Sequence, residues 1–419
     1  MIKKFTELDF PKDLQDSLIR LTFSEPTPIQ AQSIPHALRG EDVIASAQTG
    51  TGKTLAFVLP MLAKIMSTTE EKAVILMPTR ELAIQVATVV NQLIGKNIKL
   101  KTATLIGGDS MSKQLKQLKQ SPRIIVGTPG RINDHIERKS VKLGNATFLV
   151  LDETDRMLDM GFGKQIDTII ERMDPARQTL MFSATMPKGI VHLAEKYLNS
   201  PQKIEIETDK SNLERISQEF MTINEDDKLQ VLLNELERRK GSVVLFVKTK
   251  RKVEKIAKEL NNENHKVAFI HGDLKQSKRE SVLKRFRQSK FRVMVATDVA
   301  ARGLDVPHVE HVINFDLPQA AEDYIHRIGR TGRNGATGSS VSFVSGSDRD
   351  YYNDIQELID PDFVRPKKQR SKKKPGGSKG RGRSFGKKKF GGDPAKAKKG
   401  ARFSNKKPGK ASNRKKQAK

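Results

Sequence analysis

The chain of 419 residues contains no cysteine and no tryptophan. The absence of cysteine excludes disulfides, thiolate metal ligands and cysteine nucleophiles, and it is consistent with a reducing compartment. No uninterrupted apolar run approaches the roughly 18 residues that a membrane span needs, and the first residues, MIKKFTELDF, lack the apolar core of a signal peptide. We therefore expect a soluble, cytoplasmic protein that does not bind a membrane.

Acidic residues are nearly missing from the end of the chain. Of the net charge of +28, residues 365–419 contribute 24 Lys and Arg and a single acid, Asp393. This segment is also rich in Gly, Ser and Pro, so it lacks the apolar surface that would offset the entropy of folding. We expect residues 361–419 to be a disordered basic tail that binds nucleic acid, with interleaved phenylalanines available for base stacking. A solubilising tail, or one weakly attracted to anionic lipid, is the alternative.

Short β-branched segments alternate with helical patterns in two successive series. The first series runs from Val43 to Thr185 and the second from Ser242 to Val344. Such alternation is typical of parallel sheets covered by helices, and the length suits about two domains. We expect an α/β fold with two domains of one architecture, at residues 1–205 and 217–360. A polar linker at residues 206–216 would join them.

The segment AQTGTGKT follows an apolar strand pattern and precedes a helical one. In this context it predicts a phosphate-binding loop, although Ala47 stands where the strict pattern has glycine. Gly50 and Gly52 would let backbone N–H groups approach phosphates, Lys53 would pair with phosphate oxygens, and Thr54 would ligate Mg²⁺. The expected nucleotide ligands in this loop are Ala47, Gln48, Thr49, Gly50, Thr51, Gly52, Lys53 and Thr54.

The segment FLVLDETD ends an apolar strand with three acids, and the carboxyl ends of strands are where α/β sheets bind ligands. We expect Asp152 to hold Mg²⁺ through water and Glu153 to orient or deprotonate the attacking water. Asp155 would tie this loop to Ser183 and Thr185 of the segment SAT. Taken alone, such a cluster could be an acidic helix cap, but the phosphate loop in the same chain favours a nucleotide site.

A second phosphate-handling motif, HRIGRTGR, lies at positions 326–333, far from the first in the sequence. Its arginines could neutralise charge as a γ-phosphate leaves. The catalytic site would then be divided between the two domains. Hydrolysis in a divided site can be coupled to whatever brings its halves together.

The ordered motifs together resemble the DEAD-box RNA helicases of superfamily two over about residues 5–350. Besides the motifs above, the resemblance rests on FSEPTPIQ (23–30) with Phe5 upstream, PTRELA (78–83), GG (107–108), TPGR (128–131), VLFVKT (244–249), HGDLKQSKR (271–279) and ATDVAARGLDV (296–306). It implies two RecA-like domains, ATP with Mg²⁺, and RNA bound by both domains. The compact core and short basic extension look like bacterial helicases of the RhlE type.

The resemblance also implies further nucleotide ligands. Thr27 and Gln30 would read adenine, with Phe23 packed beside the base, because a side-chain amide can bond both the donor and the acceptor of the adenine edge. Gly303 and Asp305 would approach the nucleotide from the second domain. Arg330 and Arg333 would act as arginine fingers, and His326 would link them to the acidic loop.

The same resemblance implies a set of RNA contacts that read the backbone and 2′-OH groups, so sequence selectivity should be low. These residues are Pro78, Thr79, Arg80, Gly108, Thr128 and Arg131 in the first domain and Thr249, Gln276, Arg279 and Thr297 in the second. For each one, a plain structural role such as helix capping is the alternative.

We expect an RNA-stimulated ATPase, acting as a monomer, that locally separates RNA duplexes. The usual roles of such proteins are ribosome assembly, mRNA decay and cold adaptation. A nucleotide-gated RNA clamp or annealing chaperone, and a DNA-directed helicase, are the alternatives. Two residues depart from the family pattern: Thr154 stands where alanine is expected, and Thr22 where glycine is usual. We expect hydrolysis to survive the first change, with altered coupling to SAT.

Overall fold

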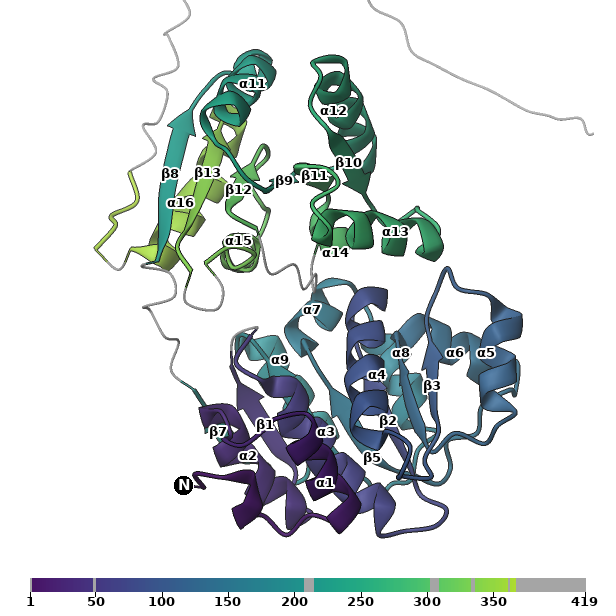
Figure 1. Cartoon of the computed structure of the whole chain (residues 1–419). Helices are drawn as coiled ribbons and strands as arrows, with labels where there is room; N and C mark the ends of the chain where they lie inside the picture. Colours follow the sequence, from purple (N-terminus) through teal and green to yellow (C-terminus); the bar gives the residue numbers. More distant parts are fainter. Residues whose placement is uncertain are drawn as a thin grey trace, which may run out of the picture. The chain divides into compact units, whose positions relative to one another are not determined.

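The computed structural model describes residues 2–47, 50–206, 215–301, 309–332, 336–360 and 362–366. These residues form two parallel sheets with helices packed on both faces of each (Figure 1). We call the part built on the first sheet lobe 1 and the part built on the second sheet lobe 2. The predicted α/β class, with two RecA-like parts, is confirmed.

Lobe 1 contains seven strands in the spatial order β3-β4-β2-β5-β6-β1-β7. In chain order they are β1 (Val43–Ser46), β2 (Lys72–Leu76), β3 (Thr102–Leu105), β4 (Ile124–Gly127), β5 (Ala146–Leu151), β6 (Gln178–Ser183) and β7 (Gln202–Glu205). Its helices are the short η1 (Phe5–Glu7) and α1 (Lys12–Arg20), α2 (Pro28–Leu38), α3 (Lys53–Met66), α4 (Arg80–Ile94), α5 (Met111–Leu118), α6 (Pro129–Glu137), α7 (Thr154–Asp159), α8 (Gly163–Ile170) and α9 (Lys188–Tyr197).

Lobe 2 contains six strands in the spatial order β10-β11-β9-β12-β13-β8. They are β8 (Ile216–Thr222), β9 (Val243–Phe246), β10 (Val267–Ile270), β11 (Val293–Ala296), β12 (His311–Asn314) and β13 (Gly338–Val344). The helices are η2 (Glu225–Asp227), α11 (Lys228–Arg238), α12 (Lys250–Asn262), α13 (Gln276–Arg287), α14 (Asp298–Ala301), α15 (Ala321–Ile328), η3 (Gly346–Asp348) and α16 (Arg349–Ile359).

The two sheets repeat one topology. When β1 to β6 are matched in chain order with β8 to β13, the strand order of lobe 1 becomes that of lobe 2, and β7 remains as an additional edge strand. All strand pairs in both sheets are parallel. The strand ends of β1 to β6 therefore have topological counterparts in lobe 2.

The cores follow from alternation along the strands. In β1, Val43 and Ala45 belong to the apolar cluster on one face of the sheet and Ile44 to the cluster on the other face, because successive side chains of a strand point to opposite faces. Phe57 of α3 packs against Phe182 of β6 with ring centroids 5.5 Å apart. Strands buried on both faces leave their carboxyl ends as the places for polar groups.

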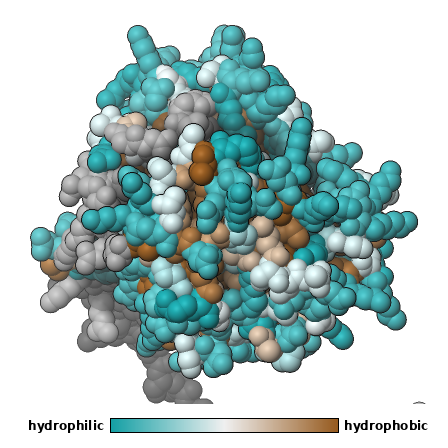
Figure 2. All heavy atoms as spheres, turned by 60° about the horizontal axis from the view of Figure 1, so that its bottom comes forward, coloured by the Kyte–Doolittle hydropathy of each residue, from teal (hydrophilic) through white to brown (hydrophobic). Residues whose placement is uncertain are grey.

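Hydrophilic side chains dominate the face of the molecule in Figure 2, and hydrophobic ones lie in recesses between them. Among the described residues, the exposed large hydrophobic side chains are Ile19, Phe23, Val191, Leu358 and Val364. No described helix is both long enough and apolar enough to cross a membrane.

The expected linker and tail fall mostly outside the described residues, which omit 207–214 and 367–419. Strand β8 begins at Ile216, so the last residue of the expected linker already belongs to the second sheet. At the other end, Phe363 packs edge-on against Tyr352, with ring centroids 6.5 Å apart.

Candidate active site and nucleic-acid interface

The loop between β1 and α3 has the backbone that a phosphate site needs. Gly50 and Gly52 have φ values of +92° and +93°, in the left-handed region that glycine adopts without strain. The side chain of Lys53 is buried, and its Nζ donates to the carbonyl oxygen of Ala47 at 2.9 Å. The Ala47 N–H donates to the carbonyl oxygen of Ser183 at 3.0 Å. The loop is therefore pinned to the end of β6.

Other loop residues complete this end of lobe 1. Thr51 and Thr54 are half-buried, and Thr54 is the second residue of α3. Gln48 and Thr49 lie outside the described residues, as do Gly303, Asp305 and Arg333 of lobe 2.

Gln30 connects the expected adenine site to the phosphate loop. Its Nε2 donates to the carbonyl oxygen of Gly52 at 2.9 Å, and its Oε1 accepts from the Thr27 N–H at 3.0 Å. Since a side-chain amide has two N–H groups and two acceptor positions, one of each remains for a base. The Oγ1 of Thr27 is buried and has no hydrogen-bond partner among the described residues. Phe23 nearby in sequence is 39% exposed. These free groups suit a ligand.

The acidic loop after β5 is buried and strained. Asp152 is only 5% exposed, and burial raises its pKa to about 6, although the nearby Lys53 opposes this shift. Glu153 has φ +51° and ψ +51°, a left-handed conformation that costs a non-glycine residue on the order of 1–3 kcal/mol. Strain of this kind is typical of active sites. The Glu153 N–H donates to Asp152 Oδ1 at 3.0 Å.

Asp155 ties the acidic loop to the segment SAT, as the sequence predicts. Its Oδ2 accepts from the Ala184 N–H at 3.1 Å and from both the N–H and the hydroxyl of Thr185 at 3.2 Å. Within SAT, the Ser183 hydroxyl donates to the Thr185 carbonyl oxygen at 2.7 Å. The two strand ends that carry these segments are thus held together by one carboxylate.

Thr154 adds a second link between the same segments. Its side chain is fully buried, and its hydroxyl lies 3.1 Å from the carbonyl oxygen of Phe182 and 3.3 Å from that of Leu151. The single hydroxyl hydrogen is shared between these two acceptors. Alanine at this position would lack the link, so the departure from the family pattern has a structural consequence.

Arg156 is a buried site residue that the sequence analysis missed. Its Nη1 lies 3.3 Å from Asp323 Oδ1, and its Nε lies 3.9 Å from Glu153 Oε2. Asp323 precedes His326 by one turn of α15, so the two side chains share a helix face. An arginine directly after the acidic motif is the only sequence signal for this contact. Arg156, directly after the acidic loop, therefore forms an ion pair with Asp323 of α15.

His326 lies in a cationic environment. Burial lowers its pKa well below the usual range, and Arg156, Arg330 and Lys53 lower it further. The imidazole is therefore neutral at pH 7. Arg330 is 6% exposed, and its Nε donates to the His326 carbonyl oxygen at 3.0 Å.

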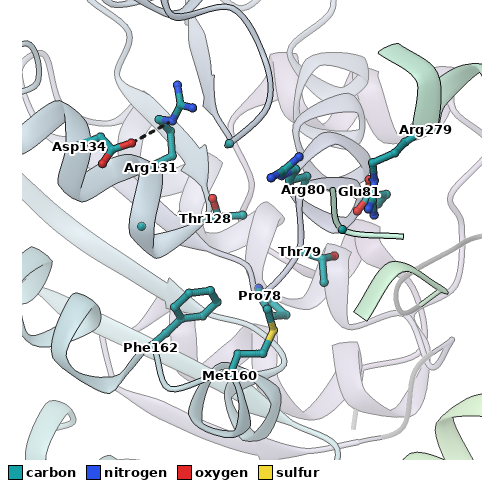
Figure 3. A pocket seen from close by; sticks show the side chains of 13 residues that line it. Pro78, Thr79, Arg80, Glu81, Thr128, Arg131, Asp134, Met160, Phe162 and Arg279 are labelled. Atoms are coloured by element: carbon teal, nitrogen blue, oxygen red, sulfur yellow. Dashed lines mark hydrogen bonds and ion pairs between the residues drawn. The ribbon is translucent and has the colours of Figure 1, made fainter. Parts of the chain in front are cut away.

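A pocket of about 400 Å³ gathers most of the expected RNA contacts of lobe 1 (Figure 3). Its lining includes the expected Pro78, Thr79, Arg80, Thr128, Arg131 and Arg279, and also Glu81, Asp134, Met160 and Phe162, which the sequence analysis did not select. Burial lowers the pKa of Arg80, and the charge of Arg279 lowers it further. An arginine-rich hollow of this kind attracts phosphate groups.

Gly108 makes room for a side chain. Its φ is +76°, and a Cβ at this position would collide with the guanidinium group of Arg80. The resemblance to the helicase family implies an RNA contact at this glycine. In the structure, the space is filled by Arg80.

Arg279 and Gln276 are already engaged by a carboxylate. Arg279 Nε lies 2.6 Å from Glu81 Oε1, and its Nη1 donates to the His271 carbonyl oxygen at 2.9 Å. Gln276 Nε2 lies 3.5 Å from the same Glu81 oxygen. Thr297, another expected RNA contact of lobe 2, is half-buried and lies directly before α14.

Two of the expected RNA contacts also cap helices. The Oγ1 of Thr79 accepts from the Leu82 N–H at the start of α4, and the Oγ1 of Thr249 accepts from the Lys252 N–H at the start of α12, both at 3.3 Å. Each helix follows the counterpart strand of its lobe, β2 or β9. Because capping uses an oxygen lone pair, each hydroxyl hydrogen remains able to donate to a phosphate.

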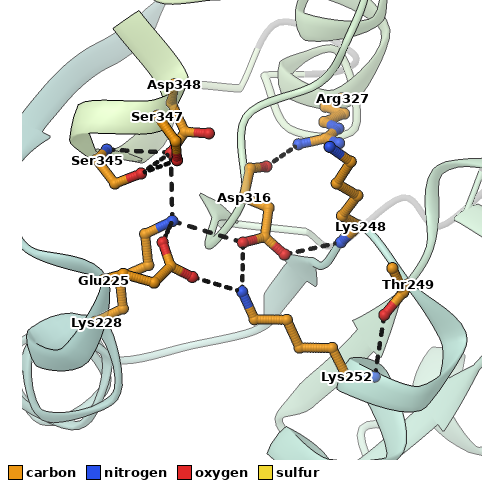
Figure 4. Close-up of polar contacts among 10 residues, drawn as sticks. All are labelled: Glu225, Lys228, Lys248, Thr249, Lys252, Asp316, Arg327, Ser345, Ser347 and Asp348. Atoms are coloured by element: carbon orange, nitrogen blue, oxygen red, sulfur yellow. Dashed lines mark hydrogen bonds and ion pairs between the residues drawn. The ribbon is translucent and has the colours of Figure 1, made fainter.

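A cluster of charged side chains lies at the start of α11, the helix of lobe 2 that is the counterpart of α3 (Figure 4). Lys228, the first residue of α11, is 1% exposed. Its Nζ lies 2.7 Å from Glu225, 3.4 Å from Asp348 and 3.5 Å from Asp316. Lys252 Nζ shares this cluster, 2.7 Å from Asp316 Oδ1. All the cluster's charges are therefore paired within the lobe.

Arg327 joins this cluster to the motif HRIGRTGR. Its Nη1 donates to the carbonyl oxygen of Asp316 at 2.6 Å, and its Nε and Nη2 bind the two carboxylate oxygens of Asp298 at 2.5 and 2.7 Å. Asp316 Oδ2 in turn accepts from the Lys248 N–H at 2.9 Å, next to Thr249. None of the connecting residues Arg327, Asp298, Asp316 and Lys248 was predicted as a site residue from the sequence.

The fold and these sites define a protein with two parallel-sheet lobes and a glycine-rich loop suited to phosphate in the first of them. The family model described as DEAD/DEAH box helicase matches residues 27–193, and the one described as helicase conserved C-terminal domain matches residues 227–335. The chain belongs to the DEAD-box helicase family.

Named relatives agree with this assignment. The chain is 44% identical over 343 residues to the DEAD-box ATP-dependent RNA helicase CshA of Bacillus cereus, covering 81% of this chain and 65% of that protein. It is 41% identical over 355 residues to CshA of Bacillus subtilis, covering 84% and 72%. The solved structure of S. cerevisiae Dbp5 bound to RNA and ADP BeF3 is similar with a TM-score of 0.77 and 34% identity, covering 86% of this chain and 94% of that one. The chain thus spans about 65% of the length of the B. cereus protein.

Proposed function

We propose that this protein is an RNA-stimulated ATPase that uses hydrolysis to separate or remodel RNA duplexes and RNA–protein complexes locally. The observation that carries the proposal is the acidic loop after β5. There a buried Asp152 and a strained Glu153 lie in a loop that Asp155 ties to SAT. The phosphate loop is pinned to the same strand, β6, through Ala47. The name of the Dbp5 complex, with RNA and a nucleotide analogue, supports both ligands.

The residues divide the chemistry between them. Lys53 neutralises phosphate oxygens, for which it needs only to exchange its bond with the Ala47 carbonyl oxygen. Glu153 orients the attacking water or accepts its proton. Arg330 and Arg333 stabilise the charge that develops on the transferred phosphoryl group, and loss of either arginine should slow hydrolysis on the order of 10³-fold or more. A neutral His326 supports this arrangement without adding charge.

The residues present also suit Mg²⁺. Asp152 is a buried carboxylate whose pKa is raised mainly by burial, which disfavours its charged form, and a bound cation would offset that cost; Thr54 offers a hydroxyl at the start of α3. Magnesium is usually held by one or two such groups together with substrate phosphates. Bound there, the ion would supply neutralisation of phosphate charge.

The ligand of the arginine-rich pocket is RNA in this proposal. Arg80, Arg131 and the free hydroxyl hydrogen of Thr79 are suited to phosphate and 2′-OH groups, which carry no sequence information. We infer low sequence selectivity. ATP and single-stranded RNA would favour one joint state of the two lobes, and loss of the γ-phosphate would weaken that state and release RNA. By linkage, each ligand strengthens the binding of the other by the same factor.

The test is ATP turnover of the purified protein with and without single-stranded RNA, with Glu153→Gln as the blank. We expect turnover that rises with RNA and disappears in the variant. Tight RNA binding without turnover would contradict the proposal and would favour a passive RNA clamp or annealing chaperone. Equal stimulation by matched DNA strands would favour a DNA-directed helicase.

Finer assignments extend the same proposal. The basic character of residues 365–419 supports the RhlE type, and the RNA chemistry is compatible with precursors of the ribosome or with RNA decay. We also propose that the protein is a monomer and that it acts in the cytoplasm. Sedimentation of the full chain and of its RNA complex would test whether it is a monomer.

A further inference from the structure

Charge is distributed unevenly within lobe 2. Residues 217–360 contain 24 Lys and Arg and 22 Asp and Glu, so the lobe as a whole is nearly neutral. Residues 248–292 alone contain 15 of those bases and only 5 of the acids. The remainder of the lobe is correspondingly acidic. Nonspecific attraction for a polyanion is therefore confined to the part of the lobe that contains α12, β10 and α13.

Helix α13 has two chemically different faces. Its buried face consists of Gln276, Arg279, Val282, Leu283 and Phe286. Its exposed side carries cations at Lys278, Lys284 and Arg285, with Lys275 directly before the helix and Lys290 just after it. We call these five exposed residues the α13 basic row.

The cations of the α13 basic row are available for a ligand. Lys278 and Lys284 make no ion pair with any described residue, whereas Lys250, which precedes this row in sequence, is paired with Asp273. Arg285 lies over the ring of Phe291, with its guanidinium carbon 5.9 Å from the centroid, which leaves its N–H groups free to bind a phosphate. Solvated surface lysines are common, so position must decide whether this row has a function.

The α13 basic row lies on the same helix as a residue that lines the pocket. Arg279, on the buried face of the same helix, lines the arginine-rich pocket together with Arg80 and Thr128 (Figure 3). Lys278 and Arg285 are separated by two turns of α13 and therefore lie on nearly the same side of the helix, about 11 Å apart along its axis at about 1.5 Å per residue. That distance corresponds to roughly three phosphates at about 3.4 Å per nucleotide of a stacked strand. Because Lys278 adjoins Arg279 in the chain, a strand that leaves the pocket beside Arg279 could follow this side of the helix.

We propose that the α13 basic row binds the phosphates of the single-stranded RNA segment that flanks the pocket, and so lengthens the RNA footprint of the protein beyond its motifs. The proposal rests on the proposed function, because it requires RNA in the pocket. It predicts that the row contributes only to RNA long enough to extend beyond the pocket. The contacts are electrostatic and independent of sequence.

The test compares two variants of the full chain with the same change in net charge. The first is Lys278→Gln with Arg285→Gln, two exposed residues on the same side of α13. The control is Lys258→Gln with Lys266→Gln, two exposed lysines of the same basic segment, one on α12 and one directly before β10. The concentration of RNA that half-saturates ATP turnover is measured between 50 and 200 mM salt, with single strands of about 6 and about 16 nucleotides, which bracket usual single-strand site sizes.

For the longer RNA, the α13 variant should lose two phosphate contacts. Its log-log salt slope should then be shallower by about 1.4, which makes its loss of affinity across the fourfold salt range about sevenfold smaller than that of the wild type. With the shorter RNA, and in the control with either RNA, the values should match the wild type. Equal effects in the two variants, or an effect with the shorter RNA, would overturn the proposal. So would an effect confined to duplex RNA. Stimulation of turnover by the shorter RNA tests the proposed function separately, since neither variant alters the pocket.

Discussion

The two lobes share one strand order but use one position in opposite ways. In lobe 1, α3 begins with the buried Lys53, whose Nζ binds only a neutral carbonyl oxygen among the contacts described. In lobe 2, the counterpart helix α11 begins with the buried Lys228, which is surrounded by three carboxylates (Figure 4). The described contacts of Lys53 thus include no carboxylate, whereas the charge of Lys228 is neutralised by acids of its own lobe.

The difference arises in the connecting loops. Before Lys53, two glycines with positive φ open the backbone, whereas before Lys228 the chain forms the acidic turn η2 with Glu225. Asp316, two residues beyond the end of β12, occupies the neighbourhood that Asp152 occupies beyond β5. A fold of this kind therefore provides a place for an anion at one strand end, and the loops decide whether phosphate or the protein's own acids fill it.

The largest effect is expected from replacing the lysine at the start of α3 in lobe 1. Lys53→Met should reduce ATP turnover by about 10³-fold, the usual effect of removing one preorganised donor to a developing charge. Its thermal unfolding should change less than that of Lys228→Met, because Nζ bonds a neutral carbonyl oxygen and lies near, but makes no described ion pair with, the carboxylate of Asp152. Turnover at saturating RNA is the measurement. Residual turnover near the wild-type level would contradict the assignment of the phosphate site.

Lys228→Met should have the complementary effect on stability. Removing the lysine leaves buried Asp316 and half-exposed Asp348 without their shared cation, which typically costs about 3–5 kcal/mol for a broken buried pair. Of the four tyrosines, Tyr324, Tyr351 and Tyr352 belong to lobe 2, so tyrosine fluorescence during urea unfolding reports mainly on this lobe.

The matched control for this stability measurement is Lys252→Met. Lys252 binds the same Asp316 and is one-third exposed, so its loss should cost less. If the two substitutions destabilise lobe 2 equally, burial of Lys228 is not the source of its effect.

A smaller effect is expected from removing the hydrogen bonds of the Thr154 hydroxyl in lobe 1. Thr154→Val removes the hydroxyl bonds to Phe182 and Leu151 while keeping the shape, and should lower the free energy of unfolding by about 1–3 kcal/mol. Thr154→Ser should retain most of the stability. Thr154→Ala should still hydrolyse ATP, with a changed number of strands separated per ATP. A turnover assay run beside an unwinding assay checks this, and identical ratios in all variants would show that the link plays no part in coupling.

The smallest effect compares one turn in each lobe. Thr22 has φ +59°, a strained value for a β-branched residue, whereas Asn264 has φ +61°, which asparagine tolerates. Thr22→Gly should raise the free energy of unfolding by up to about 1 kcal/mol, because relief of strain exceeds the added entropy of the unfolded chain. Asn264→Gly should have almost no effect. Thermal unfolding of both variants provides the comparison, and a destabilised Thr22→Gly would show that the turn is not strained.

Much of the fold could be predicted because buried parallel strands are continuous apolar segments. Every such segment from Val43 to Ser183 and from Val243 to Val344 became a strand. Strands β7 and β8 were not predicted, because they lie at sheet edges and expose many of their side chains. Part of β8 even fell within the expected linker. Edge strands carry a polar pattern that resembles that of a loop.

The sites were predictable where a motif carries its own chemistry and less so where partners come from distant segments. The tie from Asp155 to SAT follows from the motifs alone. The pair of Arg156 with Asp323, 167 residues apart, and the bonds from Arg327 to Asp298 and Asp316 depend on how separate elements pack. The same holds for Gly108, whose neighbour proved to be a guanidinium group.

Gln30 illustrates how one side chain can restrict the evolution of its position. Its amide satisfies the first turn of α2 and holds the carbonyl oxygen of Gly52. A carboxylate there could still accept from the Thr27 N–H, but it could not donate to Gly52, and a shorter amide would not span both partners. Few mutations would therefore be tolerated, even before any demand from a base is considered. Selection would therefore keep glutamine at this position because of its structural hydrogen bonds, in addition to any role in binding a base.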